Sequence, residues 1–247
     1  METDIEEFND KISFDSFFKG KIKVLQKVKG FRFSIDAPLL ASFIKTKKGD
    51  KLIELGAGNG IISLILTHSN PLKKIVTVEI QKSLVELAKK NVEINNFGNK
   101  IKVLQADLRK LCLNEKYDVV FSNPPYRKVG EGKTNPDIEK AIARHEILCD
   151  IYDVMKVTSS LMKKNGKAYF IFRTERKDDF EDACMKNKLK IKRIKYVYPK
   201  KNSKSNLFLT EVVFFSNKII EEEPIIIHKD DGTFTEEMQN ILNGKVI

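Results

Sequence analysis

The stretch YDVVFSNPPY, residues 117–126, decides how this chain is interpreted. It begins as a run of apolar and β-branched residues, which is typical of a buried strand. Proline cannot donate to a strand ladder and restricts the residue before it, so Pro124 and Pro125 predict a rigid turn directly after that strand. We therefore expect Asn123 and Tyr126 at the carboxyl edge of a sheet, which is where open α/β sheets bind ligands.

A second stretch, LIELGAGNG at residues 52–60, places Gly56, Gly58 and Gly60 between a predicted strand and a predicted helix. Glycines allow a tight turn and a close approach of the backbone to a ligand, and the start of a helix supplies free N–H groups. A dinucleotide-binding fingerprint would put its third glycine at position 61, where this chain has Ile61. The spacing thus predicts a cofactor turn and weakens the NAD interpretation.

Three acids stand at the ends of successive predicted strands. Glu54 lies just before the glycines, where a carboxylate favours a ligand with a cationic amine and repels a pyrophosphate. Glu79 follows Gly60 by nineteen residues, a position from which a carboxylate accepts hydrogen bonds from ribose hydroxyls. Asp107 ends the next strand. Each acid alone also fits an ordinary surface strand end, but the ordered set predicts a binding site for a zwitterionic cofactor.

The order of elements predicts an α/β fold. Strand, glycine turn, helix and strand over residues 51–79 form a βαβ unit with a parallel sheet. The strands predicted at 190–198 and 207–215 are joined by a short loop, so they are antiparallel. We expect a mostly parallel seven-stranded sheet with one antiparallel strand, preceded by a small hairpin whose strands are 21–24 and 28–33. The predicted division is a lead-in and basic hairpin (1–35), a main domain (36–220) and a C-terminal tail packed on it (221–247).

The net charge of +11 is large for 247 residues and indicates a polyanionic partner. Its distribution matters more than its sum, because the windows 186–204 and 19–32 hold nine and six Lys or Arg residues and no acid. A lysine-rich composition on solvated faces is the plainer explanation. The cluster Lys200, Lys201 and Lys204 is the best candidate for binding a phosphate backbone.

Other features of the composition bound the class of protein. No apolar run approaches the eighteen or so residues that cross a bilayer, and the acidic start lacks a signal core, so we expect a cytoplasmic protein with no membrane partner. Cysteine and histidine are few and scattered, which predicts packed thiols in a reducing compartment and no metal site.

The glycine turn, Glu79, Asp107 and Asn-Pro-Pro-Tyr occur in the order usual for class I S-adenosylmethionine-dependent methyltransferases, which the chain resembles. Three further segments resemble the bacterial tRNA1(Val) (adenine-N6)-methyltransferase family: FSIDAPLL at 33–40, ARHE at 143–146 and DDGTFTEE at 230–237. The resemblance runs from about residue 30 to the end. It implies a Rossmann-like fold and S-adenosyl-L-methionine as the cofactor.

The resemblance assigns roles to the residues of the turn. An adenine N6 amine is a poor nucleophile because its lone pair is delocalised into the ring. The Asn123 side-chain oxygen and the Pro124 carbonyl would accept both of its N–H bonds, while Pro125 keeps the turn rigid and Tyr126 stacks on the base. Asp107 would accept from the adenine amino group of the cofactor. Asp36 would contact the methionine end of the cofactor, although a helix-capping role fits it equally well.

The implied substrate is the adenosine immediately 3′ to the anticodon of a valine tRNA, methylated by a monomer. Arg144 and His145 fit RNA contact or ordering of the loop 127–143, and equally an ion pair with Glu146. Three alternatives stay open at this point. They are a protein-glutamine methyltransferase acting on release factors, a ribosomal RNA adenine or guanine N-methyltransferase, and an RNA-binding module without catalysis.

Overall fold

The computed structural model describes residues 12–28, 32–72, 74–125 and 149–244. The strands are β1 (Ile12–Phe17), β2 (Ile22–Lys27), β3 (Lys51–Leu55), β4 (Lys74–Glu79), β5 (Ile101–Gln105), β6 (Tyr117–Ser122), β7 (Met162–Arg173), β8 (Lys190–Lys200), β9 (Leu207–Val213) and β10 (Ile220–His228). The helices are α1 (Asp36–Phe43), α2 (Ile61–Ser69), α3 (Lys82–Ile94), α5 (Ile151–Leu161), α6 (Lys177–Lys186) and α7 (Glu236–Leu242), with short 3-10 turns η1 (Leu108–Lys110) and η2 (Thr174–Arg176).

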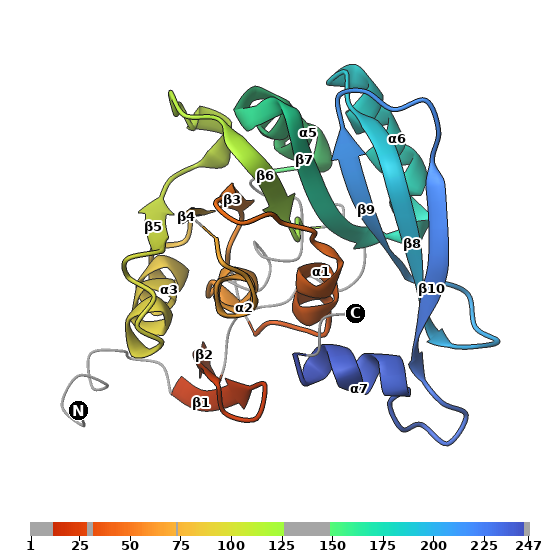
Figure 1. The fold of residues 1–247 in the computed structure, drawn as a ribbon, viewed down its shortest axis with the longest axis horizontal. Helices are drawn as coiled ribbons and strands as arrows, with labels where there is room; N and C mark the ends of the chain where they lie inside the picture. The colour runs from red at the N-terminus through yellow and green to blue at the C-terminus, as the bar shows by residue number, and fades with distance from the viewer. Residues whose placement is uncertain (1–11, 29–31, 73, 126–148, 245–247) are drawn as a thin grey trace.

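Strands β3 to β10 form one sheet in the order β10-β8-β9-β7-β6-β3-β4-β5 (Figure 1). The predicted mostly parallel sheet is confirmed, and β9 is its antiparallel strand, paired with β7 and β8. The predicted count of seven strands is wrong, because the sheet has eight. The additional strand, β10, lies at the edge beside β8, and its register shifts between Glu222 and Ile225, around Pro224. Acidic residues in its first half and a proline protect this edge strand from pairing with another chain. The same residues interrupt the alternation of polar and apolar residues by which a strand is identified from sequence.

The sheet has a switch point between β3 and β6. After β3 the chain adds β4 and β5 on one side, and it then crosses to add β6 and β7 on the other. Such a crossing leaves a crevice at the carboxyl ends of the two central strands. The ends of β3 and β6 are joined directly, since the Ser122 hydroxyl donates to the Leu55 carbonyl over 2.6 Å. The glycine turn and the Asn-Pro-Pro turn are thereby neighbours.

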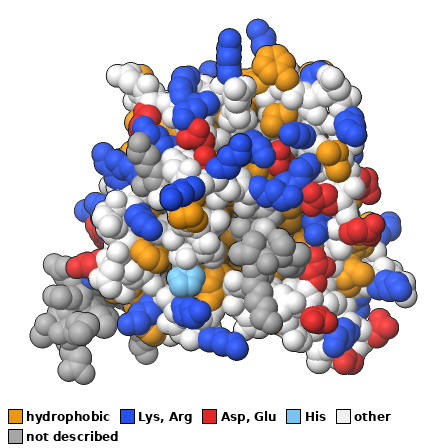
Figure 2. All heavy atoms as spheres, in the orientation of Figure 1, with side chains coloured by type: hydrophobic (Ala, Val, Ile, Leu, Met, Phe, Trp, Pro, Cys, Tyr) orange, Lys and Arg blue, Asp and Glu red, His pale blue; other side chains and the backbone are white. Residues whose placement is uncertain are grey.

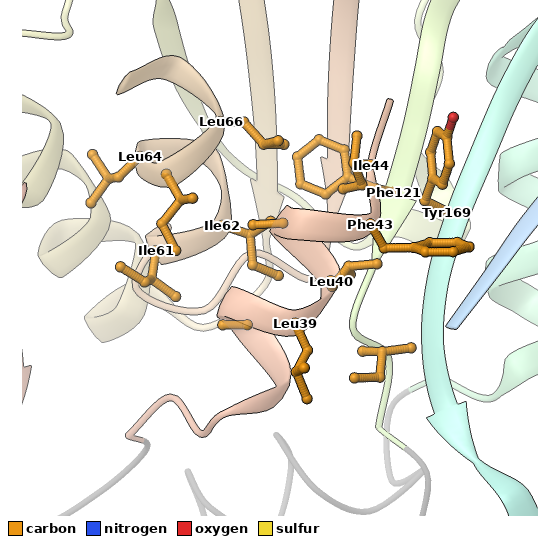
Figure 3. Close-up of a cluster of buried hydrophobic side chains, with 14 of the residues drawn as sticks. Leu39, Leu40, Phe43, Ile44, Ile61, Ile62, Leu64, Leu66, Phe121 and Tyr169 are labelled. Atoms are coloured by element: carbon orange, nitrogen blue, oxygen red, sulfur yellow. The ribbon is translucent and has the colours of Figure 1, made fainter. Parts of the chain in front are cut away.

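Helices cover both faces of the sheet. Alternate strand residues point to opposite faces, so Leu52 packs in one buried cluster and Ile53 in the other. The first cluster holds α1, α2 and the tail helix α7, and Figure 3 shows α1 residues Leu40 and Phe43 lying between α2 and the strands that carry Phe121 and Tyr169. The second cluster holds α5 and α6. No helix in the described part of the chain is long and apolar enough to cross a membrane.

The small N-terminal hairpin is present, and the predicted strand 21–24 falls at the start of β2. Its predicted partner, 28–33, is wrong, because Ile12 pairs with Lys27 and Phe17 with Ile22, so the partner is β1, which precedes β2. The hairpin turn uses positive φ angles at Phe18 (54°), Lys19 (57°) and Gly20 (86°). Only the glycine of these is a sequence signal for that turn. The division of the chain at residues 35 and 220 stays a prediction.

Candidate active site

A cavity of about 310 Å³ opens at the switch point of the sheet. Its wall brings together residues from far apart in the sequence, among them Arg32, Phe33, Ser34, Asp36, Glu54, Gly56, Gly58, Asn59, Glu79, Gln81, Leu108, Asn123, Pro124, Pro125, Cys149 and Arg173. Both motifs that the sequence singled out therefore face one space.

The glycine turn has the conformation that its sequence predicts. Gly56, Gly58 and Gly60 have φ angles of 72°, 56° and 82°, a region that side chains disfavour. The N–H groups of Gly56 and Ala57 donate to the Val78 carbonyl of β4 over 2.9 and 3.0 Å. Gly60 precedes the first turn of α2, whose N–H groups have no partner within the helix. Gly56 and Gly58 line the cavity, and Gly60 starts the helix behind it.

Glu79 ends β4 and braces this turn. One of its carboxylate oxygens accepts from Gly58 N–H over 2.9 Å, and the other accepts from the N–H groups of Ile80 and Gln81, both over 2.9 Å. Glu79 is 6% exposed and lines the cavity, in the position predicted for a ribose-binding acid.

Glu54 is a buried carboxyl on the cavity wall. It accepts a hydrogen bond from the Ser63 hydroxyl of α2. Burial raises its pKa from 4.5 to about 8, against the opposing effect of the Ser63 hydrogen bond. A cationic amine entering the cavity would favour the ionised form, so the site suits a positively charged ligand group.

We expect the stability of the protein to depend on Glu54 between pH 4.5 and pH 8. In that window the folded state keeps a proton that the unfolded state has released, so the free energy of unfolding falls as pH rises, by up to about 1.4 kcal/mol per pH unit. Urea unfolding of Glu54→Gln and wild type at pH 5, 6.5 and 8 isolates this effect. The difference should grow in favour of the variant with pH, and a constant difference would show that Glu54 is already ionised at pH 5.

Asn123 follows β6, and its side-chain oxygen lacks a hydrogen-bond donor in the described part of the chain. This oxygen is also buried. A buried acceptor without a partner is costly in a folded protein unless a ligand or water satisfies it. Pro124 is buried and Pro125 half-buried beside it, both on the cavity wall. The turn thus presents an acceptor on a rigid support.

Of the two predicted cofactor residues Asp36 and Asp107, only Asp36 lines the cavity. Asp36 is buried, lines the cavity and begins α1, so the N-cap position that was its alternative role is occupied by Ile35. Asp107 does not line the cavity. It accepts from Arg109 N–H over 3.0 Å and from the Arg109 guanidinium over 2.6 Å, and this pairing lowers the pKa of the carboxyl. Leu108 takes its place on the wall.

The basic residues chosen from the sequence fall in two groups. Lys200, at the end of β8, and the exposed Lys201 and Lys204 form the turn to β9. Because β8 runs parallel to β7, this turn lies at the same sheet edge as Asn123, three strands away and beyond it along the strand direction. Lys200 donates to the Asp230 carbonyl over 3.2 Å, which joins the turn to the tail. Tyr126, Arg144 and His145 lie outside the described residues, as does the loop 127–143.

The structure adds residues that the sequence did not suggest. Arg173 ends β7 on the cavity wall. The sequence could have indicated it, because it is a charged residue at the end of an apolar run. Cys149 also lines the cavity, and burial raises the pKa of its thiol to about 12. Asn59, inside the glycine turn, is completely buried. Among the described residues no group of three His, Cys, Asp or Glu side chains is placed to hold a metal ion.

Comparison with known proteins agrees with this geometry. The model of the methyltransferase small domain matches residues 32–147, which span the glycine turn and the Asn-Pro-Pro-Tyr motif. Over that segment the chain resembles methyltransferase small domains. Several related proteins that match most of the chain are named tRNA1(Val) (adenine(37)-N6)-methyltransferase. One from Flavobacteriaceae bacterium strain 3519-10 is 26% identical over 88% of this chain and 92% of its own, and one from Bacteroides thetaiotaomicron is 27% identical over 76% and 79%.

Solved structures show that the chain has a known fold. A predicted O-methyltransferase from Agrobacterium tumefaciens superposes with a TM-score of 0.67 at 21% identity, covering 85% of this chain and 97% of its own. A tRNA m1G37 methyltransferase from M. jannaschii gives 0.58 at 15% identity, over 83% and 55%. At these identities the likeness is one of architecture, and it confirms the predicted Rossmann-like methyltransferase fold.

Proposed function

We propose that the protein transfers a methyl group from S-adenosyl-L-methionine to N6 of an adenosine in tRNA, the adenosine 3′ to the anticodon of tRNA1(Val). The observation that carries the proposal is the Asn123 oxygen, which has no hydrogen-bond partner among the described residues and lies in the same cavity as Glu54, Glu79 and the glycine turn. A site that accepts an amine at one end and a zwitterion with a ribose at the other fits this pair of ligands. The relatives' names supply the nucleotide.

The residues present fit the cofactor. The glycine turn and the first turn of α2 would receive its carboxylate end, Glu54 would face its amine, and Glu79 would accept from its ribose. When bound, S-adenosyl-L-methionine supplies an electrophilic methyl group. Asp36 lies on the same cavity wall as the glycine turn and would contact the methionine end of the cofactor. Asp107 would reach the adenine of the cofactor only after exchanging its hydrogen bonds with Arg109.

The chain's own contribution to the reaction is to hold and activate the target amine. The Asn123 oxygen accepts one N–H of the amine and the Pro124 carbonyl the other, which localises the lone pair on nitrogen. The two prolines limit motion of these acceptors, so they need not reorganise during the reaction. Tyr126 is proposed to stack on the base, and Arg144 and His145 to contact RNA. The base must leave its stack to enter the cavity, which is easiest in a loop such as an anticodon arm.

Labelled S-adenosyl-L-methionine with unmodified tRNA tests the reaction. We expect label in tRNA, recovered after digestion as N6-methyladenosine, and none in release factor. Label in release factor alone would replace the proposal by glutamine methylation, and label only in ribosomal RNA by the ribosomal alternative. The predicted monomeric state and cytoplasmic location stay predictions.

The basic turn gives a separate expected result. Replacing Lys200, Lys201 and Lys204 by alanine should raise KM for tRNA on the order of tenfold and lower the slope of log affinity against log salt by about two to three. Basic side chains are spread over the whole face in Figure 2, so the control must remove the same charge elsewhere. Lys188, Lys190 and Lys218, exposed at the opposite sheet edge, serve as that control. An equal loss in the control triple would show that only total charge matters.

A further inference from the structure

Asn91 of α3 and Asn95, the residue that follows α3, form hydrogen bonds with the hairpin strand β2 as a neighbouring strand would. The Asn95 side chain accepts from Lys23 N–H over 2.9 Å and donates to Lys23 C=O over 2.7 Å. The Asn91 side chain does the same with Leu25, over 2.7 and 3.1 Å. A side-chain amide carries the same donor and acceptor as a peptide group, so residues four apart on a helix can pair with residues two apart on a strand. The free edge of β2 is thereby closed by α3.

Asn91 and Asn95 differ in where their third hydrogen bond goes. Asn95 Nδ2 donates to the Asn91 carbonyl over 2.7 Å, whereas Asn91 Nδ2 donates to the Asn59 carbonyl over 3.0 Å, inside the glycine turn. Asn91 and Asn59 are both completely buried. One side chain therefore joins the hairpin, α3 and the turn predicted to bind the cofactor.

The position of this contact in the turn matters. The Asn59 carbonyl belongs to the peptide that links Asn59 to Gly60, and the N–H of that peptide donates to the Ala57 carbonyl over 2.9 Å. Its two polar groups are thus fixed on opposite sides, immediately before the first N–H groups of α2. The Asn59 side-chain oxygen and nitrogen have no hydrogen-bond partner among the described residues, so the side chain does not hold this peptide in place. Asn91 does.

We propose that Asn91 is a positioning residue for the cofactor: it fixes the Asn59–Gly60 peptide, and so the first N–H groups of α2, in the orientation that receives the cofactor. This inference rests on the proposed use of S-adenosyl-L-methionine. It extends that proposal to a residue that touches no ligand, and it makes the docked hairpin part of the support of the cofactor site.

The test compares Asn91→Ala with Asn95→Ala. Both variants lose two hydrogen bonds to β2, but only Asn91→Ala loses the bond to the glycine turn. Titration calorimetry with S-adenosylhomocysteine should give a Kd raised about tenfold in Asn91→Ala and less than twofold in Asn95→Ala. The melting temperatures of both variants should fall by similar amounts. KM for S-adenosyl-L-methionine should rise in Asn91→Ala while kcat at saturating cofactor stays within twofold of wild type.

Three outcomes decide the matter. An unchanged Kd in Asn91→Ala overturns the inference, and so does an equal rise in both variants, because the effect would then come from loosening the hairpin. Absence of binding to wild type overturns the proposed cofactor and this inference with it. If Asn91→Ala does not fold, Asn91→Ser retains a small hydroxyl one bond too short to reach Asn59, and the same comparison with Asn95→Ser applies.

Discussion

Replacing Asn123 by alanine is expected to lower kcat for tRNA methylation by about 10²–10³-fold, the usual cost of removing one preorganised polar group that acts on the reacting atoms. The buried Asn123 oxygen has no partner among the described residues, so its removal breaks no hydrogen bond of that oxygen within this part of the chain. We therefore expect the melting temperature to stay close to that of wild type. The affinity for S-adenosylhomocysteine should change less than about threefold. Single-turnover kinetics with saturating tRNA measure the effect on the chemical step.

The matched variants for this experiment are Asn123→Asp and Ser122→Ala. Aspartate keeps an acceptor oxygen at the same position and should retain more activity than alanine. Ser122 is the adjacent residue, but its hydroxyl is already used by the Leu55 carbonyl, so its loss should lower stability more than kcat. An Asn123→Ala enzyme with more than half of the wild-type kcat would remove Asn123 from the reaction.

The residues that the sequence placed correctly at strand ends share one physical basis. Glu54, the glycines, Glu79 and Asn123 all lie at the ends of central parallel strands, and parallel strands place their carboxyl ends at one edge. Once the strands were identified from their apolar runs, the meeting of these residues followed from topology. Lys200 reached the same edge for the same reason, through β8.

The parts that the sequence did not predict depend on side-chain pairing. The position of Asp107 at a strand end was correct, but its carboxylate turns to Arg109, two residues later, and away from the cavity. The spacing of strand ends carries no information about such a local choice.

Asn91 shows the same limit. It stands in the apolar stripe of α3 with Leu84, Leu87 and Ala88, and its partners on β2 and at Asn59 are 66 and 32 residues away. A polar residue at a core position indicates that its side chain must have hydrogen-bond partners. The sequence alone does not identify those partners. The hairpin was misplaced for a related reason, because alternation of polar and apolar residues continues on both sides of its turn and does not mark the register.

Replacing Arg193 by methionine is expected to destabilise the protein by about 3–5 kcal/mol, the usual cost of removing one partner from a buried ion pair. Arg193, on β8, donates to Glu211 of β9 and to Glu222 of β10, both over 2.6 Å, and its guanidinium lies 4.5 Å from the centre of the Phe43 ring of α1. Burial alone would raise the pKa of Glu211, but Arg193 and Lys167 hold it below its usual value. Without Arg193, the 1%-exposed Glu211 keeps only its weaker contacts, at 3.3 Å or longer, with lysines, and with the hydroxyl of Tyr169 at 3.2 Å. Urea unfolding followed by circular dichroism measures the loss.

Arg176→Met is the matched control, since Arg176 is as buried as Arg193 and also lies against a phenylalanine, but it forms an ion pair with the partly exposed Asp179, in the first turn of α6. We expect it to cost less than Arg193→Met, because the partly exposed carboxylate of Asp179 stays accessible to water when the guanidinium is removed. The double variant Arg193→Met, Glu211→Gln should recover part of the stability lost in Arg193→Met, because it removes the carboxylate that would otherwise stay buried without its guanidinium. If the double variant is less stable than Arg193→Met, the packing of Arg193 on Phe43 and its bond to β10 carry the effect, and the charge of Glu211 does not.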